Sequence, residues 1–489
     1  MKNVIAVLLS LAVFGTVAHG QFAEDVLRFS QFNMGVGARA LGMGNVGVGF
    51  ADDYSALFRN PAGLALLRDY EFSVGLSQSS YKNDVSFFGN TSQASLNALN
   101  LNNLGIVYPV PTVRGSLTFA FGFGRVANYT TTASFDGFNP RSSIIESLTP
   151  KVNVRNMPSS ERQRLLERNI PFQIFLADTV GGVLFPVVYD SVQQRGTVQE
   201  GGGMNNWSLG GAIDIARNLS VGVSVNILSG SYRYERDYSE VDVRNVYNYQ
   251  NRYDAFHRFN YLSTVNSDIT GLNALVGIVY RKPGLFRIGA TVRTPTVYEI
   301  EETFTDRGES EFDPNSSGIV DRFDKSTEGS TKYEIRTPPI LAFGASVQIG
   351  DWLVLAGDAE YTDWTQMQFT TNNADLEAEN RLIKRLFEPT TNLRGGAEAT
   401  LWNLGVQLRA GIGLNPSPYK DDPPEFDQMQ YTGGIGFKLE ENVYLNGAFT
   451  YGTWTTIRDN YYVQGLSNPS RTRESVKSTN LTVTLSYRF

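Results

Sequence analysis

The chain has 489 residues, a net charge of −7, 47 glycines, 24 tyrosines, 30 phenylalanines and no cysteine. The acidic balance and the lack of a basic stripe argue against a nucleic-acid partner. The lack of cysteine excludes a disulfide framework and a lipid attached through cysteine at a cleavage site.

Residues 1–20 have the pattern of a secretory leader. Lys2 precedes an apolar stretch from Val4 to Val17, and the small residues of Ala18-His19-Gly20 follow it. This order predicts export and cleavage before Gln21. A membrane anchor is the alternative, but the apolar run is short for spanning hydrocarbon.

Residues 21–69 do not read as part of a sheet. The segment Ala23–Gln31 predicts a short helix, and a glycine-dense stretch from Gly35 to Gly49 follows it. A second short helix is expected from Asp53 to Asn60, because Pro61 disfavours helix at the residue before it. A phosphate-binding loop is the alternative for the glycines, but no Lys-Ser or Lys-Thr follows them.

The rest of the chain alternates like strands. In Leu481–Phe489 every odd position is apolar and every even one is polar, which puts one apolar face on a strand. After the leader, no apolar stretch approaches 20 residues. A helical membrane protein is therefore disfavoured, and a closed barrel is the other way to satisfy backbone groups in lipid.

Connection lengths give the topology. We expect about fourteen strands in an all-β, antiparallel transmembrane barrel over residues 70–489. Short turns are predicted near 109–114, 217–218, 282–283, 350, 402–403 and 440–441. Long connections are predicted near 81–99, 131–203, 239–266, 301–331, 371–388, 418–427 and 458–474. Short periplasmic turns and long outer loops are typical of outer-membrane barrels, so both termini are expected in the periplasm.

The longest connection, 131–203, is predicted to be a partly helical extracellular insertion. It joins a polar helical segment near 158–168 to a run that contains Phe172, Phe175, Leu176 and Phe185. So much apolar surface should be covered by something. This surface could form a ligand groove, or it could pack the insertion over the barrel mouth. Both roles can hold at once.

Strand parity predicts a charged lumen. If the apolar neighbours face lipid, Arg287, Arg293 and Arg409 face inward, since charge on the lipid face is costly. Each arginine is a candidate partner for the carboxylate of a ligand. The commoner alternative is that they pair with lumen carboxylates or anchor a plug.

Enzyme chemistry has little support. His257 is the one histidine after the leader, and there is no cysteine. A hydrolase triad or a zinc site would need more such groups. We expect no catalytic residues, no metal and no cofactor.

The segment GARALGMGNVGVGFADDYSALFRNPAGLA, from Gly37 to Ala65, resembles the N-terminal region of the FadL/TodX family of outer-membrane transporters. Asn60-Pro61-Ala62 matches the family's NPA motif. The resemblance implies that residues 21–69 form a hatch inside the barrel. It also implies passive uptake of long-chain fatty acids or related compounds through an outer groove, a lumen pocket and a sideways exit.

The expected partners are a fatty acid-like molecule, outer-membrane lipid and the barrel-assembly machinery, which reads a terminal aromatic such as Phe489. The chain is expected to be a monomer. The alternative function is a non-transporting FadL-like barrel that serves as a PorV-like scaffold or shuttle in protein secretion. A polar porin is a third possibility, against which the predicted plug argues.

Overall fold

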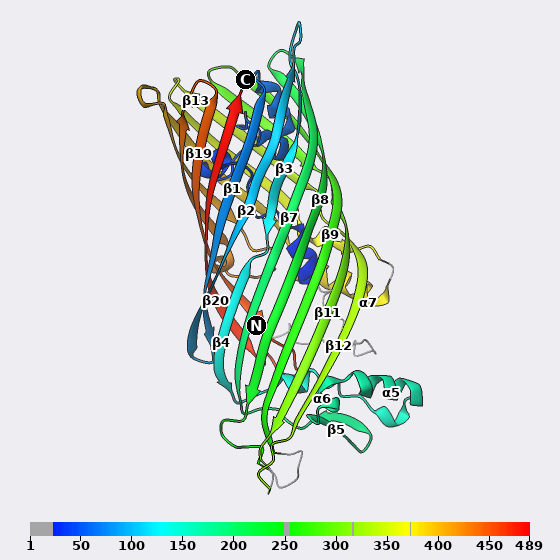
Figure 1. The fold of residues 1–489 in the computed structure, drawn as a ribbon. Helices are drawn as coiled ribbons and strands as arrows, with labels where there is room; N and C mark the ends of the chain where they lie inside the picture. The colour runs from blue at the N-terminus through cyan, green and yellow to red at the C-terminus, as the bar shows by residue number, and fades with distance from the viewer. Residues whose placement is uncertain (1–22, 249–254, 315–316, 372) are drawn as a thin grey trace.

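The computed structural model describes residues 23–248, 255–314, 317–371 and 373–489. Fourteen antiparallel strands close into a barrel (Figure 1), which confirms the predicted fold class. Four of them are interrupted, so each of these four comprises two segments. The wall consists of β1 (Glu71–Phe87), β2 (Asn90–Val110), β3 with β4 (Leu117–Asn128, Thr131–Asn139), β7 (Val192–Ala216), β8 (Leu219–Val241), β9 (Phe256–Lys282), β10 with β11 (Phe286–Arg293, Val297–Phe312), β12 with β13 (Arg322–Arg336, Ile340–Ile349), β14 with β15 (Leu353–Asp363, Gln368–Phe369), β16 (Pro389–Leu401), β17 (Val406–Asn415), β18 (Gln428–Lys438), β19 (Val443–Asp459) and β20 (Arg471–Arg488).

The first and last strands close the barrel. β1 pairs with β20 in a continuous register from Glu71↔Arg488 to Ser86↔Arg473. Prolines account for two of the interruptions: Pro295 separates β10 from β11, and Pro338-Pro339 separates β12 from β13. Proline has no amide hydrogen to donate to a ladder, so pairing stops there.

The two ends of the barrel differ as predicted. Six short turns and Phe489 lie at one end, which we call the turn end; it is uppermost in Figure 1. The longer connections lie at the opposite end, the loop end. They comprise residues 140–191, 242–255, 313–321, 370–388, 416–427 and 460–470.

The first connection at the loop end was predicted wrongly. Residues 81–99 were expected to be a long loop, but β1 and β2 meet at a tight turn of Phe88 and Gly89. Likewise, β4 and the start of β7 occupy the two ends of the predicted insertion 131–203, so the connection itself is 140–191. Both differences have the same cause, which is that the polarity of the strands reverses along their length.

Strand β9 shows this reversal. Near the turn end its outward residues are apolar, including Leu272 and Ile278. Nearer the loop end Asp268 points outward, while Ile269 and Tyr261 are buried inside. An outward apolar band suits a bilayer, and charged outward residues beyond it place the rest of the strand in water. Reading only for outward apolar positions therefore ends these strands too early.

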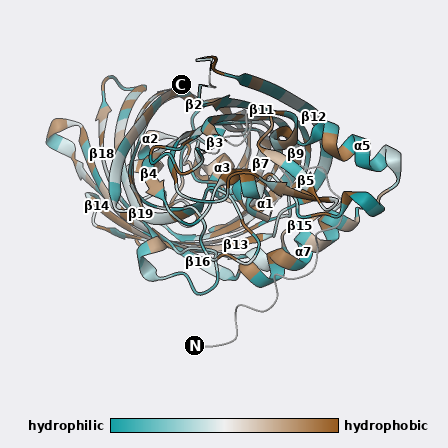
Figure 2. Ribbon diagram, turned by 90° about the horizontal axis from the view of Figure 1, so that it is seen from below, coloured by the Kyte–Doolittle hydropathy of each residue, from teal (hydrophilic) through white to brown (hydrophobic). Residues whose placement is uncertain are grey.

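The N-terminal segment lies inside the ring of strands, as Figure 2 shows. We call residues 23–69 the hatch. It contains α1 (Ala23–Ser30), α2 (Ala38–Gly42), α3 (Ala56–Arg59) and the 3-10 helix η1 (Pro61–Leu66). The predicted leader, residues 1–20, lies outside the described residues.

The loops carry the remaining elements. The connection 140–191 holds α4 (Ile144–Ser147), η2 (Val154–Asn156), α5 (Ser159–Arg168), α6 (Ile170–Gln173) and the hairpin β5–β6 (Ala177–Val180, Val183–Pro186). The others hold η3 (Trp364–Gln366), α7 (Ala374–Leu386), η4 (Trp402–Leu404) and η5 (Pro424–Phe426). None of the helices in the described ranges is long and apolar enough to cross a membrane.

Deleting Phe489 is expected to impair barrel closure. Phe489 and Tyr70 exchange two backbone hydrogen bonds of 3.0 Å, and their rings stack with centroids 5.4 Å apart. Each lost hydrogen bond costs about 1 kcal/mol. We expect slower folding into lipid vesicles, measured by the mobility shift of unheated samples in gels. The control is Tyr462→Ala, an exposed loop aromatic. Folding of the deletion variant at the wild-type rate would contradict this role.

Candidate functional site

The hatch rests on a belt of wall glycines. At Gly344 an added Cβ would lie 2.8 Å from the amide nitrogen of Gly49, and at Gly289 it would overlap the carbonyl oxygen of Val48. The other wall glycines that touch hatch backbone or the Asn60 side chain are Gly222, Gly277, Gly396, Gly411 and Gly434. Because only glycine allows two backbones to come this close, the belt sets where the hatch sits.

The Asn60-Pro61-Ala62 motif joins the hatch to the wall. The Asn60 side chain donates to the carbonyls of Val48, at 2.7 Å, and of Ile278 in β9, at 3.2 Å. Its oxygen accepts from the amide of Ala62 at 3.1 Å, where it caps η1. Pro61 starts η1, where its missing amide hydrogen costs nothing. One side chain thus fixes a hatch turn, a helix start and a wall strand.

Buried charges surround this contact. Arg39 of α2 holds Glu398 of β16 through two bonds of 2.8 Å and also pairs with Asp52. Arg287 of β10 donates to Asp52 at 2.8 Å, and Arg409 of β17 donates to Glu398 at 2.6 Å. Burial raises the pKa of Asp52, but Arg39 and Arg287 outweigh it and hold that pKa well below its usual value. Asp52 therefore stays ionised at neutral pH.

A second carboxylate binds hatch backbone directly. Asp358 of β14 accepts from the amides of Gly47, at 2.6 Å, and Val48, at 3.0 Å. Arg59 of the hatch lies 3.7 Å from Asp358 and 3.8 Å from Glu360. Removing one partner from such a buried set leaves the others unsatisfied, which is strongly destabilising.

The structure places all three predicted lumen arginines against the hatch or its partners. Arg287 and Arg409 belong to the network around Asp52 and Glu398. Arg293 differs: it donates to the carbonyl of Phe58 at 3.3 Å and covers the Phe32 ring at 4.5 Å. Its second terminal nitrogen, Nη1, is buried and has no hydrogen-bond partner among the described residues. Arg293 is thus the predicted lumen arginine with a spare donor.

The wall is incomplete between β2 and the β3–β4 strand, a junction that we call the seam. The ladder between β2 and β3 stops at Asn103↔Gly124. Beyond it, β4 pairs with β7, and residues 90–101 of β2 pair with β1 alone. A bulge at Val126 and the interruption at Tyr129-Thr130 follow the point where the ladder with β2 ends. The seam therefore lacks ladder hydrogen bonds between its two strands.

Hatch residues 33–37 bridge the seam. On the β3 side, Met34 donates to the carbonyl of Val126 at 3.0 Å, and Asn33 exchanges bonds of 3.0 and 3.2 Å with the backbone of Asn128. On the β2 side, the Asn102 side chain accepts from the amide of Gly37 at 2.8 Å and donates to the carbonyl of Gly35 at 3.0 Å. The hatch thus occupies groups that a neighbouring strand would otherwise bind.

Aromatic side chains lie on the inner side of the seam. Phe29 of α1 meets Tyr129 and Tyr232 edge to face, each with centroids 5.8 Å apart. On the outer side Leu99 of β2 is 73% exposed. The seam therefore has buried aromatic side chains on its inner side and an exposed apolar side chain on its outer side.

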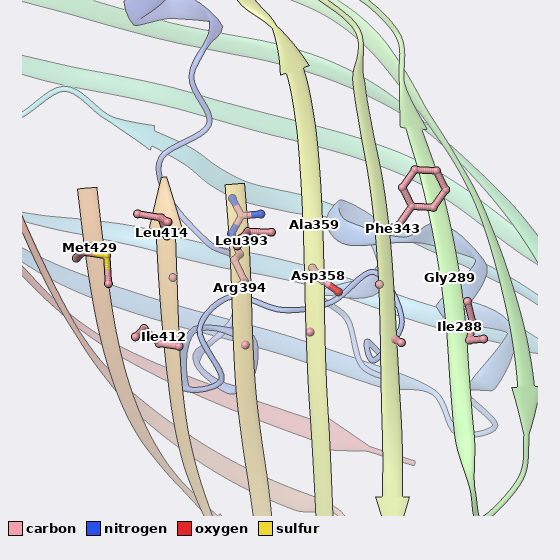
Figure 3. Close-up of a pocket in the computed structure, with 15 residues that line it drawn as sticks. Ile288, Gly289, Phe343, Asp358, Ala359, Leu393, Arg394, Ile412, Leu414 and Met429 are labelled. Carbon is pink, nitrogen blue, oxygen red and sulfur yellow. The ribbon is translucent and has the colours of Figure 1, made fainter. Parts of the chain in front are cut away.

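A separate apolar hollow of about 570 Å³ lies on the outside of the wall. Figure 3 shows side chains from neighbouring strands around it, including Phe343 of β13, Leu393 of β16 and Ile412 of β17, with Asp358 on the intervening β14 and Arg394 next to Leu393 on β16. The outward residues Gly357 and Gly395 have no side chains to fill it. Because it opens outward within the apolar band, it faces lipid and is not a lumen pocket.

The four predicted groove residues are spread over the loop region. Leu176 is fully buried in the larger hydrophobic cluster at the loop end, which also contains Phe259. Phe172 packs against a smaller cluster around Leu184. Phe175 is 39% exposed, with its ring 4.5 Å from Phe323, and Phe185 is half-buried. Much of the predicted apolar surface is thus used in packing.

Sequence reasoning missed the residues that bridge the seam. One signal was present: Asn102-Asn103 breaks the apolar alternation of β2, as a bulge does. Nothing in the sequence pairs Asn102 with Gly35 or Asn33 with Asn128, since these contacts join segments 67 and 95 residues apart. Among the described residues there is also no group of three or more His, Asp or Glu that could hold a metal ion.

A fourteen-stranded barrel with a hatch bonded inside its lumen is the architecture of a plugged outer-membrane β-barrel protein. Residues 203–489 match the family described as outer membrane protein transport protein (OMPP1/FadL/TodX). This is more than half of the chain, so the protein belongs to that family of outer-membrane transport proteins.

Solved structures support the same fold. A Pseudomonas aeruginosa FadL homologue resembles the chain with a TM-score of 0.57 at 13% identity, covering 94% of this chain and 100% of that one. The Pseudomonas putida toluene transporter TodX gives a TM-score of 0.53 at 14% identity, covering 93% and 99%. No curated protein sequence matches the chain.

Asp358→Ala is expected to loosen the hatch without unfolding the barrel. It removes the acceptor of two hatch amides, and each buried amide left unpaired costs about 1–3 kcal/mol. We expect hydrogen exchange in residues 44–50 to accelerate at least about tenfold, since roughly 1.4 kcal/mol is tenfold. The control is Asp84→Ala on the outer face of β1. Unchanged exchange in the hatch would show that Asp358 does not hold it.

Proposed function

We propose that this protein carries long-chain fatty acids or related hydrophobic compounds across the outer membrane by diffusion, and releases them sideways through the seam. In this proposal the loop end faces outward and the turn end, with both termini, faces the periplasm. The observation that carries the proposal is the end of the β2–β3 ladder at Asn103↔Gly124 beside the apolar face of α1.

The straight route through the barrel is unsuitable for an apolar molecule. The hatch crosses the lumen, and its contacts with the wall include the charged groups around Arg39 and Asp358. On the turn side of the hatch lies a polar vestibule of about 720 Å³, lined by charged groups that include Arg39, Asp52 and Arg287. Moving an apolar chain through such a layer would displace paired charges, which is costly.

For an apolar ligand, the seam offers a lower energy barrier to exit than the route past the hatch. Here β2 and the β3–β4 strand are not paired with each other, and hatch residues 33–37 bond to the backbone of Val126 and Asn128 on one side and to the Asn102 side chain on the other. A small shift of this segment would uncover a gap with Phe29 and Tyr129 on its inner side. The ligand would then leave into the hydrocarbon, where its apolar chain is stable.

The ligand class follows from two observations. The relatives described above include a toluene transporter, which favours the transport of apolar molecules over the scaffold alternative. The spare donor of Arg293 is suited to a carboxylate, which fatty acids have and plain hydrocarbons lack. We further propose that Phe172, Phe175 and Phe185, still partly accessible at the loop end, give the ligand its first contact.

A crosslink across the seam is expected to stop uptake. The chain has no cysteine, so Asn33→Cys with Asn128→Cys can be joined by a short bis-methanethiosulfonate reagent, which forms a reducible disulfide with each thiol and releases methanesulfinate. Cells that lack their own transporter and express this variant should take up labelled oleate before crosslinking, lose most of the uptake after it, and recover it on reduction.

The matched control joins two exposed loop positions, Val180→Cys and Val183→Cys in the β5–β6 hairpin, with the same reagent. Uptake should then persist. Correctly inserted wild-type protein that gives no oleate uptake above the vector would refute the fatty-acid proposal. Full uptake by the crosslinked Asn33/Asn128 variant would instead refute the seam as the exit.

Arg293→Gln is expected to weaken the binding of oleate about tenfold or more, because a charge-assisted hydrogen bond contributes about 1.5–3 kcal/mol. Binding of oleyl alcohol, which has no carboxylate, should change little. Equilibrium dialysis of the purified protein in detergent measures both. Arg281→Gln, in the vestibule, is the control. Equal loss for the acid and the alcohol would show that Arg293 acts only by supporting the hatch.

A further inference from the structure

A hollow lined by arginines lies on the outer face of the wall at the loop end. Its volume is about 500 Å³, and its lining includes Arg141, Arg471, Arg473, Phe88, Phe426 and Ile457. The register places it outside the barrel: Arg473 pairs with Ile457 of β19 and Ser86 of β1, and these positions alternate with buried inward ones. We call it the arginine hollow.

Cations exceed carboxylates around it. Arg471 is paired with Asp459 at 2.6 Å, Arg473 with Glu425 at 2.7 Å. On the same face Lys477 lies 3.3 Å from Asp84. Two further cations, Arg141 and Lys82, have no carboxylate of the described residues within ion-pair distance.

The two lysines on this face oppose each other. Lys82 of β1 and Lys477 of β20 are direct cross-strand partners, and both point outward. Like charges in this position destabilise a sheet. Arg141 is likewise held by uncharged groups only, the carbonyl of Asn468 at 3.1 Å and the ring of Phe88 at 5.7 Å. An anion on this face would relieve the repulsion.

The distance of these cations from the apolar band of the wall indicates which anion they would meet. On β20 the outward apolar band ends at Leu481. Lys477 is four residues farther along the strand and Arg473 eight, which corresponds to about 10 Å and 20 Å at the rise and tilt of a barrel strand. In the proposed orientation this is the level of the lipid headgroups of the outer leaflet and just beyond. A ligand at this level is anchored by its chains in the apolar band below.

We propose that the arginine hollow, with Lys82 and Lys477 beneath it, binds the phosphorylated saccharide headgroup of an outer-leaflet lipid. The lysines would meet a phosphate near the membrane, and Arg141 a second phosphate farther out, through the geometry that suits guanidinium to phosphate. Phe88, Phe426 and Ile457 provide apolar surface for the saccharide rings. The inference rests on the orientation given under the proposed function, and not on transport itself.

The test is lipid binding by the full-length protein in detergent, measured by native mass spectrometry. The probes are a bisphosphorylated disaccharide lipid, the same lipid without phosphates, and inorganic phosphate as a competitor. The variant is Lys82→Gln with Arg141→Gln. The matched control is Arg195→Gln, another outward cation beyond the apolar band, on β7.

We expect the wild type and Arg195→Gln to bind the bisphosphorylated lipid equally, and the double variant to bind it about tenfold less tightly. Equal binding of both lipids by the wild type, or unchanged binding by the double variant, would overturn the proposal. Displacement of the lipid by millimolar inorganic phosphate would also overturn it, because the site would then be a free-anion site. The lipid-binding experiment does not measure oleate uptake. A failed uptake experiment would therefore refute the proposed function without affecting this result.

Discussion

The close contact between two backbones governs this structure. The hatch and the wall touch backbone to backbone, at Gly289 against Val48 and at Gly344 against Gly49. Such an approach leaves no room for water, so every polar group near it needs a partner in the protein. Asn60 and Asp358 supply these partners, and Arg39, Arg287 and Arg409 balance the charge. Packing and electrostatics therefore hold the hatch in one position.

A hatch fixed at its centre leaves its N-terminal part as the adjustable element. Residues 33–37 make their wall contacts at the seam, through side chains and single backbone bonds. Such bonds contribute about 1 kcal/mol each and are exchanged more easily than a buried ion network. The buried ion network therefore resists movement of the central hatch, whereas the contacts of residues 33–37 permit movement at the seam. This difference suits lateral release.

Sequence alone predicted much of the barrel but little of the seam. Period-two alternation, as in Leu481–Phe489, depends only on neighbouring residues, so it showed the strands and the inward direction of Arg287, Arg293 and Arg409. The long β1–β2 hairpin was missed because its outward face is polar beyond the apolar band, with Lys82 and Asp84 outside and Tyr81 and Val85 inside.

Contacts between distant segments had no local signal. The partner of Asn102 is set by the register of β2 and by the depth of the hatch. Neither can be inferred from the residues that flank Asn102 in the sequence. The same holds for the spread of the groove residues, since composition cannot tell whether Phe172 and Leu176 cover each other or a ligand.

The central claim is that a ligand meets the seam and does not pass below the hatch. A fluorophore attached at Ala98→Cys, on the inward face of β2, reports on the seam, and one at Gln407→Cys reports on the vestibule. Quenching of each by dibromostearate in detergent measures how near the bound chain lies. We predict saturable quenching at residue 98 and none at residue 407. Saturable quenching at residue 407 with none at residue 98 would contradict lateral release.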